Sequence, residues 1–301
     1  MDLGTNTFHL LIAEGNINDF REIVHEHIAV KLGEGGINKD IILRAAFERG
    51  INTMKNFTRQ IGDNNAQQIR AIATSALRNA SNGKDFIREV KKETGIEIEV
   101  VDGAREATFI YKGVKAAGLL TPESSLIMDI GGGSVEFIIC NDKNLVWKQS
   151  FEIGAARLME KFHHADPIPP AVIEALELYL EHALSDLFRA VKDTNIYNLI
   201  GSSGAFETFA ELAAFKRSDV FDLKKIKNYV FDYEELLDVT DRLLLSTHAE
   251  REANPLIIPV RVDMIVVASL ITRYILQKLA INHVALCTYS LKEGVLAGMM
   301  G

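Results

Sequence analysis

The chain has 301 residues, of which 48% are hydrophobic and 25% charged, a composition typical of a globular protein with one or two domains. Its formal net charge of −8 argues against general nucleic-acid binding, which needs a basic surface. No apolar run approaches the roughly 20 residues that cross a bilayer, and the first residues do not resemble a signal peptide. We therefore expect a cytoplasmic protein without nucleic-acid or membrane partners, with Cys140 and Cys287 as reduced core residues.

The first predicted element is a turn between strands, in the opening stretch MDLGTNTFHLLIAE. Asp2 to Thr7 is polar and Phe8 to Ala13 is an apolar strand, although only Met1 precedes the turn. Glycine lets the backbone approach a ligand closely and reach positive φ, successive N–H groups can form an anion nest, and threonine hydroxyls add donors. Two interpretations follow: an ordinary hairpin turn, or a phosphate site formed by Gly4, Thr5, Asn6 and Thr7.

Alternating helices and strands follow this hairpin. The apolar spacing predicts helices over 39–61, 84–93 and 104–116, and strands over 69–73 and 97–101. Such alternation indicates α/β layers.

A second copy of the opening hairpin occupies residues 126–140, LIMDIGGGSVEFIIC, and keeps its leading strand over 125–128. Asp129 aligns with Asp2, and Glu136 occupies the strand position that His9 has in the first copy. The repeat suggests two similar domains facing each other across a cleft, and it favours the phosphate interpretation for both turns. An aspartate cannot attract phosphate directly, so we expect it to hold a cation against the phosphate. The phosphate-binding residues of the second turn would be Gly131, Gly132, Gly133 and Ser134.

The second half contains a third candidate anion site. Residues 197–200 are predicted to form a strand, 201–204 (GSSG) a tight loop and 205–215 a helix, whose N-terminus would present Gly204 to an anion. Further helices are predicted over 170–191, 233–248 and 262–279, and Ser290 with Glu293 forms a capping-box pattern at the start of a final helix. The histidines without metal-ligand spacing are interpreted as surface residues: His163, His164 and His248.

Several stretches together resemble the exopolyphosphatase/guanosine pentaphosphate phosphatase (Ppx/GppA) family of the actin-like ATPase superfamily. They occur in the family's order along nearly the whole chain: DLGTNTFHLLIA, AIATSALRNASNG (71–83), EIEVVDGAREATFIYKGV (97–114), MDIGGGSVEFI (128–138), EIGAARLMEKF (152–162), LIGSSGAF (199–206), RVDMIVVAS (261–269) and YSLKEGVL (289–296).

The resemblance implies an α/β fold in which two ribonuclease H-like domains flank a central active-site cleft. The expected domains are residues 1–120, completed by a C-terminal helix over about 290–301, and residues 121–289. The implied activity is hydrolysis of terminal phosphoryl groups of inorganic polyphosphate or guanosine pentaphosphate with Mg²⁺ or another divalent cation. A homodimer is implied only by relatives.

The resemblance also implies roles for the acidic residues. Glu106 would activate water, although an acidic residue in a first helical turn also favours the helix dipole. Glu136 would face the cleft and hold the metal with Asp129, and Asp2 is a third metal candidate; the alternative is that Glu136 faces solvent.

Other residues fall in the family's cleft-side stretches. Thr74, Ser75 and Arg78 lie in one of them, and Arg78 would pair either with a phosphate or in a structural ion pair. For Arg261 the default is an ion pair at a helix start.

The expected mechanism is therefore phosphoanhydride hydrolysis, with the two glycine turns binding phosphate and Glu106 acting on water. Two alternatives remain open: a small-molecule kinase of the same fold, and a catalytically weak guanosine-nucleotide or polyphosphate sensor. The chain departs from the family in Arg105, where an acidic residue is common, and in a first strand cut to Met1. Because it stops at Gly301, like short members, we expect better turnover on short polyphosphates than on long ones.

Overall fold

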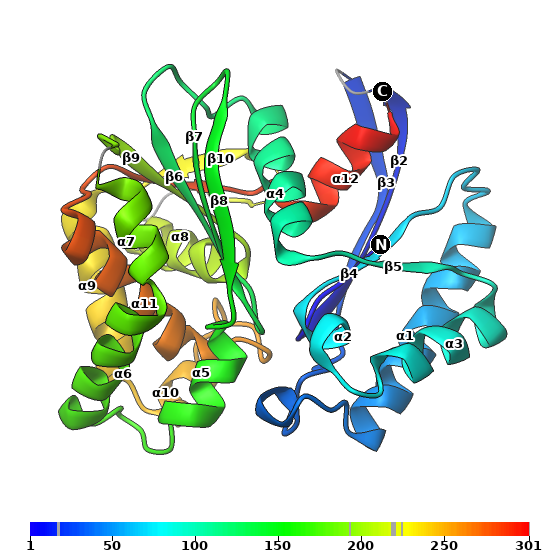
Figure 1. The fold of residues 1–301 in the computed structure, drawn as a ribbon, viewed down its shortest axis with the longest axis horizontal. Helices are drawn as coiled ribbons and strands as arrows, with labels where there is room; N and C mark the ends of the chain where they lie inside the picture. Colours follow the sequence, from blue (N-terminus) through cyan, green and yellow to red (C-terminus); the bar gives the residue numbers. More distant parts are fainter. Residues whose placement is uncertain (17–18, 193, 218–220, 224, 301) are drawn as a thin grey trace.

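The computed structural model describes residues 1–301 except 17–18, 193, 218–220, 224 and 301, and contains two β-sheets with their helices (Figure 1). The elements up to residue 117 are β1 (Asp2–Leu3), β2 (Thr7–Asn16), β3 (Asp19–Ala29), η1 (Ile37–Lys39), α1 (Arg44–Asp63), β4 (Ala71–Ala73), α2 (Ser75–Asn79), α3 (Gly83–Thr94), β5 (Ile98–Val100) and α4 (Gly103–Ala117). The later ones are β6 (Ser125–Ile130), β7 (Val135–Cys140), β8 (Leu145–Phe151), α5 (Ala155–Phe162), α6 (Pro170–Ala183), α7 (Ser185–Val191), β9 (Asn198–Ser202), α8 (Gly204–Lys216), β10 (Asn228–Val230), α9 (Tyr233–Leu245), α10 (His248–Glu252), α11 (Met264–Leu279), β11 (Val284–Cys287) and α12 (Leu291–Met299).

The two sheets repeat the same topology. The first has the order β3-β2-β1-β4-β5, and the second has the order β10-β11-β9-β6-β7-β8. In the first sheet β1 pairs antiparallel with β2 and parallel with β4, and in the second sheet β6 pairs antiparallel with β7 and parallel with β9. The expected fold class, two ribonuclease H-like α/β units that derive from an internal repeat, is confirmed.

The strand before the first turn is short rather than missing. Residues Asp2 and Leu3 form β1, which lies between β2 and β4 and pairs with both. Met1 extends this pairing, because its carbonyl accepts from Ile72 N at 3.0 Å and its amino group donates to Arg70 O at 2.6 Å. In the described part of the chain, the strand that leads into the first turn is therefore a central strand of only two residues.

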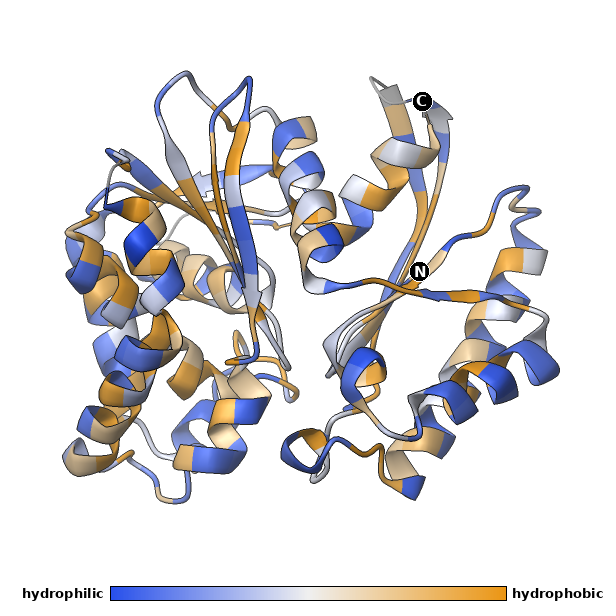
Figure 2. Cartoon of the chain, in the orientation of Figure 1, coloured by the Kyte–Doolittle hydropathy of each residue, from blue (hydrophilic) through white to orange (hydrophobic). Residues whose placement is uncertain are grey.

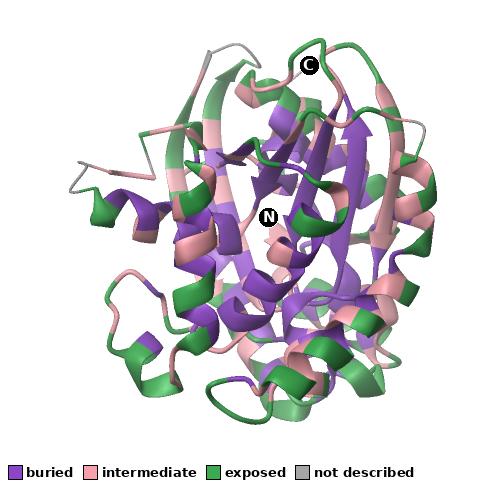
Figure 3. Cartoon of the chain, turned by 90° about the vertical axis from the view of Figure 1, so that its left-hand side faces the viewer, coloured by how far each residue is buried: buried purple, intermediate pink, exposed green. Residues whose placement is uncertain are grey.

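Hydrophobic packing forms a cluster around each sheet and a third cluster between them. The third cluster brings Ile110 of α4 and Val295 of α12 together with Ile127 and Ile138 of the second sheet. Figure 2 shows hydrophobic residues along the strands, and Figure 3 shows that β6 and β7 are buried throughout. Cys140 and Cys287 are buried free thiols of this core, as expected.

The last helix, α12, lies beside α4 between the two sheets (Figure 1). The predicted capping box is confirmed: Ser290 and Glu293 bond reciprocally at its start. The helices approach so closely that a Cβ at Gly113 would overlap the carbonyl of Ser290, and a Cβ at Gly294 would overlap that of Phe109. Glycine is therefore required at both positions where α4 and α12 cross. This packing places the residues just before α12 at the cavity described below.

Several predicted helices have different boundaries in the structure. The helix expected over 170–191 is two helices, α6 and α7, with the buried Leu184 at the break. The helix expected over 233–248 ends at Leu245, because Thr247 caps a new helix through Glu250 N. The first one begins at Arg44 rather than Lys39. Among the described residues, no helix is long and apolar enough to span a membrane.

Candidate active site

The two Asp-x-Gly turns have the same hydrogen bonding and register. Gly4 N donates to Thr7 O at 3.1 Å, and Gly131 N donates to Ser134 O at 3.0 Å. Across the first turn Asp2 pairs with His9, and across the second Asp129 pairs with Glu136. Directly paired residues point to the same face of a sheet, so each aspartate lies beside its partner. Glu136 is only 1% exposed, and the alternative that it faces solvent is therefore wrong.

The glycines of the second turn serve close approach rather than positive φ. Neither Gly4 nor Gly131, Gly132 or Gly133 belongs to the described glycines with positive φ, which corrects that part of the expectation. A Cβ at Gly132 would overlap the Asn6 side chain. One at Gly133 would overlap Ser75 Oγ and lie 2.7 Å from Thr5 Oγ1. Side chains of the first turn therefore rest directly on the backbone of the second, and the two turns face each other.

A cavity of about 880 Å³ opens at these turns. It brings together almost all of the predicted site residues: Asp2, Gly4, Thr5, Asn6, Thr7, Ser75, Glu106, Asp129, Gly131, Gly132, Gly133, Ser134, Glu136 and Gly204. Arg78 does not line the cavity, but it donates a hydrogen bond to Glu106, which does line it.

Glu106 is held in the cavity by the first turn of α4. Asp102 caps this helix, accepting from Arg105 N at 2.7 Å. Glu106 is 6% exposed and accepts from Arg78 Nη1 at 2.8 Å. Burial, and then the charge of Glu136, raise the pKa of Glu106 well above its ordinary value, although Arg78 acts in the opposite direction. A buried carboxyl group with a raised pKa in a cavity is a candidate functional group, and a helix-dipole role alone would not require this burial.

Asp129 is buried and Asp2 is partly buried, and neither forms an ion pair within hydrogen-bond distance among the described residues. Burial raises the pKa of Asp2 to about 6 and that of Glu136 to about 7, and it also raises the pKa of Asp129. Asp129 accepts hydrogen bonds of 2.6 Å from both Ser202 Oγ and Ser203 Oγ. Ser203 has a φ of 69°, a strained value for a residue other than glycine, and strain of this kind is common at functional sites.

The Gly201–Gly204 loop contributes Ser203 and Gly204 to the cavity, and its anion-binding role stays a prediction. Its serines bind the Asp129 carboxylate, and the Arg261 guanidinium lies where a Cβ of Gly204 would be. Arg261 pairs with Glu207 Oε2 at 2.6 Å, so the ion-pair interpretation describes it, with a partner on α8. The loop thus binds the Asp129 carboxylate through its serine hydroxyls and packs against the Arg261 guanidinium.

Sequence reasoning missed the buried Lys292, which also lines the cavity. Burial lowers its pKa, but Glu293, Glu207 and Asp2 act more strongly together, so that the pKa of Lys292 is raised. It is thus a cation near Asp2 of the first turn, Glu207 of α8 and Glu293 of α12. Lys292 lies within the stretch YSLKEGVL, between the capping-box residues Ser290 and Glu293, and the sequence alone does not show that it enters the cavity.

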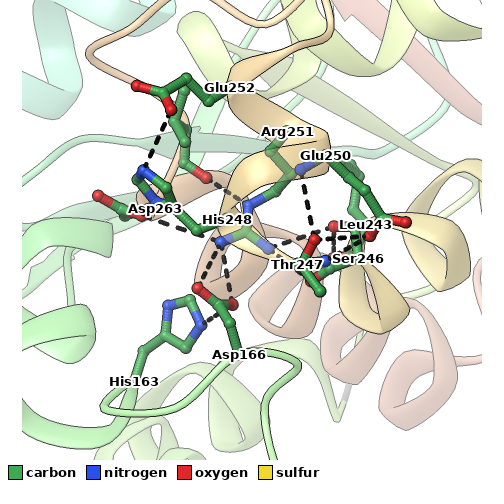
Figure 4. Close-up of polar contacts among 11 residues, drawn as sticks. His163, Asp166, Leu243, Ser246, Thr247, His248, Glu250, Arg251, Glu252 and Asp263 are labelled. Atoms are coloured by element: carbon green, nitrogen blue, oxygen red, sulfur yellow. Dashed lines mark hydrogen bonds and ion pairs between the residues drawn. The ribbon is translucent and has the colours of Figure 1, made fainter.

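His163 and His248 belong to a separate cluster around the buried Arg251 (Figure 4). Arg251 Nη2 donates to both carboxylate oxygens of Asp166 at 3.0 Å, and Arg251 Nε donates to Val262 O at 2.6 Å. His163 bonds to Asp166 and its side chain is only 3% exposed, so the expectation of a surface residue is wrong for His163. His248 is half-exposed and bonds to Asp263.

Three residues of this cluster could offer ligand atoms to a metal. The nearest ligand atoms of Asp166, His248 and Asp263 all lie within 4.8 Å of one another. However, the Arg251 guanidinium already binds Asp166 with both oxygens and lies 3.8 Å from Asp263 Oδ1. A cation is therefore already present among these carboxylates, and the arrangement is a structural ion-pair network.

Comparisons with known proteins agree with the resemblance seen in the sequence. Residues 11–301 match the model of the Ppx/GppA phosphatase family. Exopolyphosphatase 1 of Mycobacterium leprae (strain TN) is 26% identical over 298 residues, covering 98% of this chain and 87% of the relative. The crystal structure of an exopolyphosphatase from Cytophaga hutchinsonii ATCC 33406 is 41% identical with a TM-score of 0.96, covering 99% of this chain and 96% of that one.

A more distant structure, the Aquifex aeolicus PPX-GPPA enzyme, shares the fold with a TM-score of 0.80 at 24% identity, covering 99% of this chain and 97% of that chain. The repeated turns, the cavity between the sheets and these similarities over nearly the whole length lead to one assignment. The chain belongs to the Ppx/GppA phosphatase family.

Proposed function

We propose that the protein is a phosphoanhydride hydrolase that releases terminal phosphate from inorganic polyphosphate. The observation that carries this proposal is the buried Glu106, which shares one cavity with both Asp-x-Gly turns. A kinase of the same fold would instead need an aspartate base directed at an alcohol. The names of the relatives from M. leprae and C. hutchinsonii support the same substrate.

The buried carboxylates fit a divalent cation. Asp2, Asp129 and Glu136 offer only oxygen ligands, the kind that Mg²⁺ prefers. Burial disfavours their ionised forms and raises their pKa values, and a bound cation would offset this cost. Among the described residues, these three do not bring ligand atoms within 4.8 Å of one another. We assign Asp129 and Glu136, with Asp2, as the carboxylates that would hold Mg²⁺, with water completing the ligand set.

The chemistry assigns separate tasks to the residues of the chain. The N–H and hydroxyl groups of residues 4–7 and 131–134 bind the terminal phosphate, and bound Mg²⁺ supplies charge neutralisation of its oxygens. Glu106 orients a water molecule and takes its proton as the water oxygen bonds to phosphorus. The bond between the terminal phosphorus and the bridging oxygen breaks, which yields orthophosphate and a polyphosphate that is one phosphate unit shorter. Arg78 keeps the Glu106 carboxylate oriented.

Guanosine pentaphosphate presents the same terminal anhydride and is a second candidate substrate. The cavity of about 880 Å³ exceeds what a terminal phosphate needs, so it has room for a longer or bulkier remainder. A sensor that binds without turnover remains the alternative in a different class.

A substrate panel tests the proposal. Phosphate release should be measured side by side from tripolyphosphate, longer polyphosphates, guanosine pentaphosphate and ATP, with Mg²⁺ and with EDTA. We expect Mg²⁺-dependent release from polyphosphate and little from ATP. Tight binding of polyphosphate without release would favour the sensor, and phosphate transfer from ATP to an alcohol would favour the kinase.

The raised pKa values predict a pH-dependent effect of Mg²⁺ on stability. Asp2 and Glu136 have folded-state pKa values of about 6 and about 7, above the ordinary values of 3.8 and 4.5, so the folded state binds more protons in this window. Their contribution to stability is therefore present at low pH and lost as the pH rises through the folded-state values. Mg²⁺ binds the ionised carboxylates, so it should raise the melting temperature more at about pH 8 than at about pH 5.5.

Differential scanning fluorimetry with EDTA and with Mg²⁺ at the two pH values checks this. An effect of Mg²⁺ that is equal at both, or larger at the lower pH, would contradict the assignment of these carboxylates.

A further inference from the structure

Glu152 follows β8 directly, and donors from both sides of the cavity hold its carboxylate. Ser75 Oγ donates to Oε2 at 2.9 Å and Arg78 Nη2 donates to Oε1 at 2.9 Å. Arg157 Nη2 donates to Oε2 at 3.0 Å. Ser75 and Arg78 lie on α2, which packs in the core of the first sheet, and Arg157 lies on α5, which packs in that of the second. A single carboxylate thus bridges the two halves of the molecule.

The groups that hold Glu152 are those that bind a phosphoryl group. Each guanidinium group presents a planar set of N–H donors to oxygen atoms, and the serine hydroxyl adds one O–H donor. Charge-assisted hydrogen bonds from guanidinium groups are stronger than hydrogen bonds between neutral groups. The Arg78 and Arg157 side chains are only 17% and 13% exposed, so their charges are poorly screened by water. Two largely shielded guanidinium groups and a hydroxyl that converge on one carboxylate form an oxyanion site.

This oxyanion site adjoins the proposed reaction centre. Arg78 Nη1 holds Glu106, and Arg157 Nε donates to the carbonyl of Gly133 at 3.2 Å. Ser75 Oγ occupies the space that a Cβ of Gly133 would take. An anion bound here therefore lies between the proposed base and the second glycine turn, where a phosphate of the substrate would lie.

Glu152 is suited to leave this position. Its side chain is 43% exposed, in contrast to the two arginines that bind it. Burial acts to raise its pKa, but hydrogen bonds from Arg78, Asn79 and Ser75 hold the pKa of Glu152 below its ordinary value. It is thus an anion at neutral pH, and a phosphate in the same site would repel it toward solvent.

We propose that Ser75, Arg78 and Arg157 form a phosphoryl subsite that Glu152 fills in the free protein, so that a phosphoanhydride or orthophosphate must displace Glu152 to bind. This inference rests on the proposed function and adds a built-in competitor to it. When phosphate displaces Glu152, the carboxylate no longer links α2 to α5. Phosphate binding is thereby coupled to the loss of this contact between the two halves of the molecule. Glu152 is in this view a residue that sets affinity, not one that takes part in the chemistry.

Intramolecular competition predicts a definite effect on affinity. The apparent dissociation constant is the intrinsic one divided by the fraction of free sites, so a competitor present about nine-tenths of the time weakens binding about tenfold. Glu152→Gln keeps the size of the side chain but removes its charge. It should therefore bind orthophosphate about tenfold more tightly than the wild-type protein does.

Glu160→Gln is the matched control. Glu160 also bridges the two halves, accepting from Gly35 N at 2.7 Å and from Asn38 Nδ2 at 3.3 Å, but it contacts neither Ser75 nor Arg78. Its replacement removes one negative charge and one bridge without freeing the subsite. Isothermal titration calorimetry of the full chain with orthophosphate, in EDTA and at low and high salt, should show little change for this variant.

Adding Arg157→Gln to Glu152→Gln should abolish the gain, because the freed subsite then lacks one guanidinium. Glu152→Ala is the second variant, and it should show a gain at least as large as that of Glu152→Gln. Equal gains in Glu152→Gln and Glu160→Gln, or a gain that vanishes at high salt, would overturn the inference in favour of a general charge effect. Unchanged or weaker binding by both Glu152 variants would also overturn it. Binding needs no turnover, so these outcomes stay distinct from a failure of the wild-type protein to hydrolyse polyphosphate.

Discussion

Replacing Glu106 by Gln should lower kcat for phosphate release by roughly 10²–10⁴-fold, the usual loss when a general base is removed. The amide oxygen can still accept the 2.8 Å hydrogen bond from Arg78, so the cavity should keep its shape. KM should change little, because the substrate is bound by the turns. Steady-state kinetics on tripolyphosphate with saturating Mg²⁺ measures both constants.

The same variant separates catalysis from a helix-dipole role. If Glu106 served only the dipole of α4, its loss would cost roughly 0.3–1 kcal/mol of stability and leave turnover intact. As a base in a buried site it contributes no such stabilisation, since burial has raised its pKa above the ordinary value. The melting temperature of the variant should therefore be equal or higher at neutral pH.

Glu99→Gln is the matched control for this experiment. Glu99 pairs with Arg70 and Arg105 close to α4 but does not line the cavity. It should keep the wild-type kcat. A Glu106→Gln protein with near-normal kcat, or an equal loss in both variants, would rule out Glu106 as the base.

Replacing Asp129 by Asn should have the second large effect, a loss of Mg²⁺ affinity of at least about 100-fold. Changes in groups that only orient metal ligands typically cost 10–100-fold, so loss of a carboxylate ligand should reach the upper end of this range or exceed it. Excess Mg²⁺ should then restore activity only in part. Activity as a function of Mg²⁺ concentration, together with calorimetric titration of the metal, measures the change.

The second group of possible ligands provides the control. Asp263→Asn removes one carboxylate from the Asp166, His248 and Asp263 cluster, in which Arg251 already supplies a cation. It should leave the Mg²⁺ dependence unchanged. A wild-type metal response in Asp129→Asn, or a shifted response in Asp263→Asn, would place the metal elsewhere.

Local sequence patterns were sufficient to predict the repeated turns and most helices and strands. A turn and its flanking strands depend on nearby residues, so Asp2–Thr7 and Asp129–Ser134 could be recognised without tertiary information. The capping box of Ser290 and Glu293 is local in the same way. Because the two hairpins share a register, the repeat also predicted the equivalent topology of the two sheets.

One break within a helical pattern was not predictable in this way. The periodicity over 170–191 continues through Leu184, yet the chain turns there to bury that side chain. The end of the helical stretch before His248, by contrast, follows from a local signal, because Thr247 and Glu250 form a capping box. Where a helix breaks without a local cap, as at Leu184, depends on which conformation buries more apolar surface, and spacing along the chain does not reveal this.

The sequence by itself thus determined the two hairpins, the α/β layers and the residue types at the cavity. Only the tertiary structure decided which charges meet. Arg78 lies 28 residues from Glu106 and 74 from Glu152, and it binds both. Such pairings, and the raised pKa values that follow burial, arise from groups far apart in the chain that share a region of low polarity. A one-dimensional pattern does not contain that proximity, so Glu152, Arg157 and Lys292 emerged only when the chain was folded.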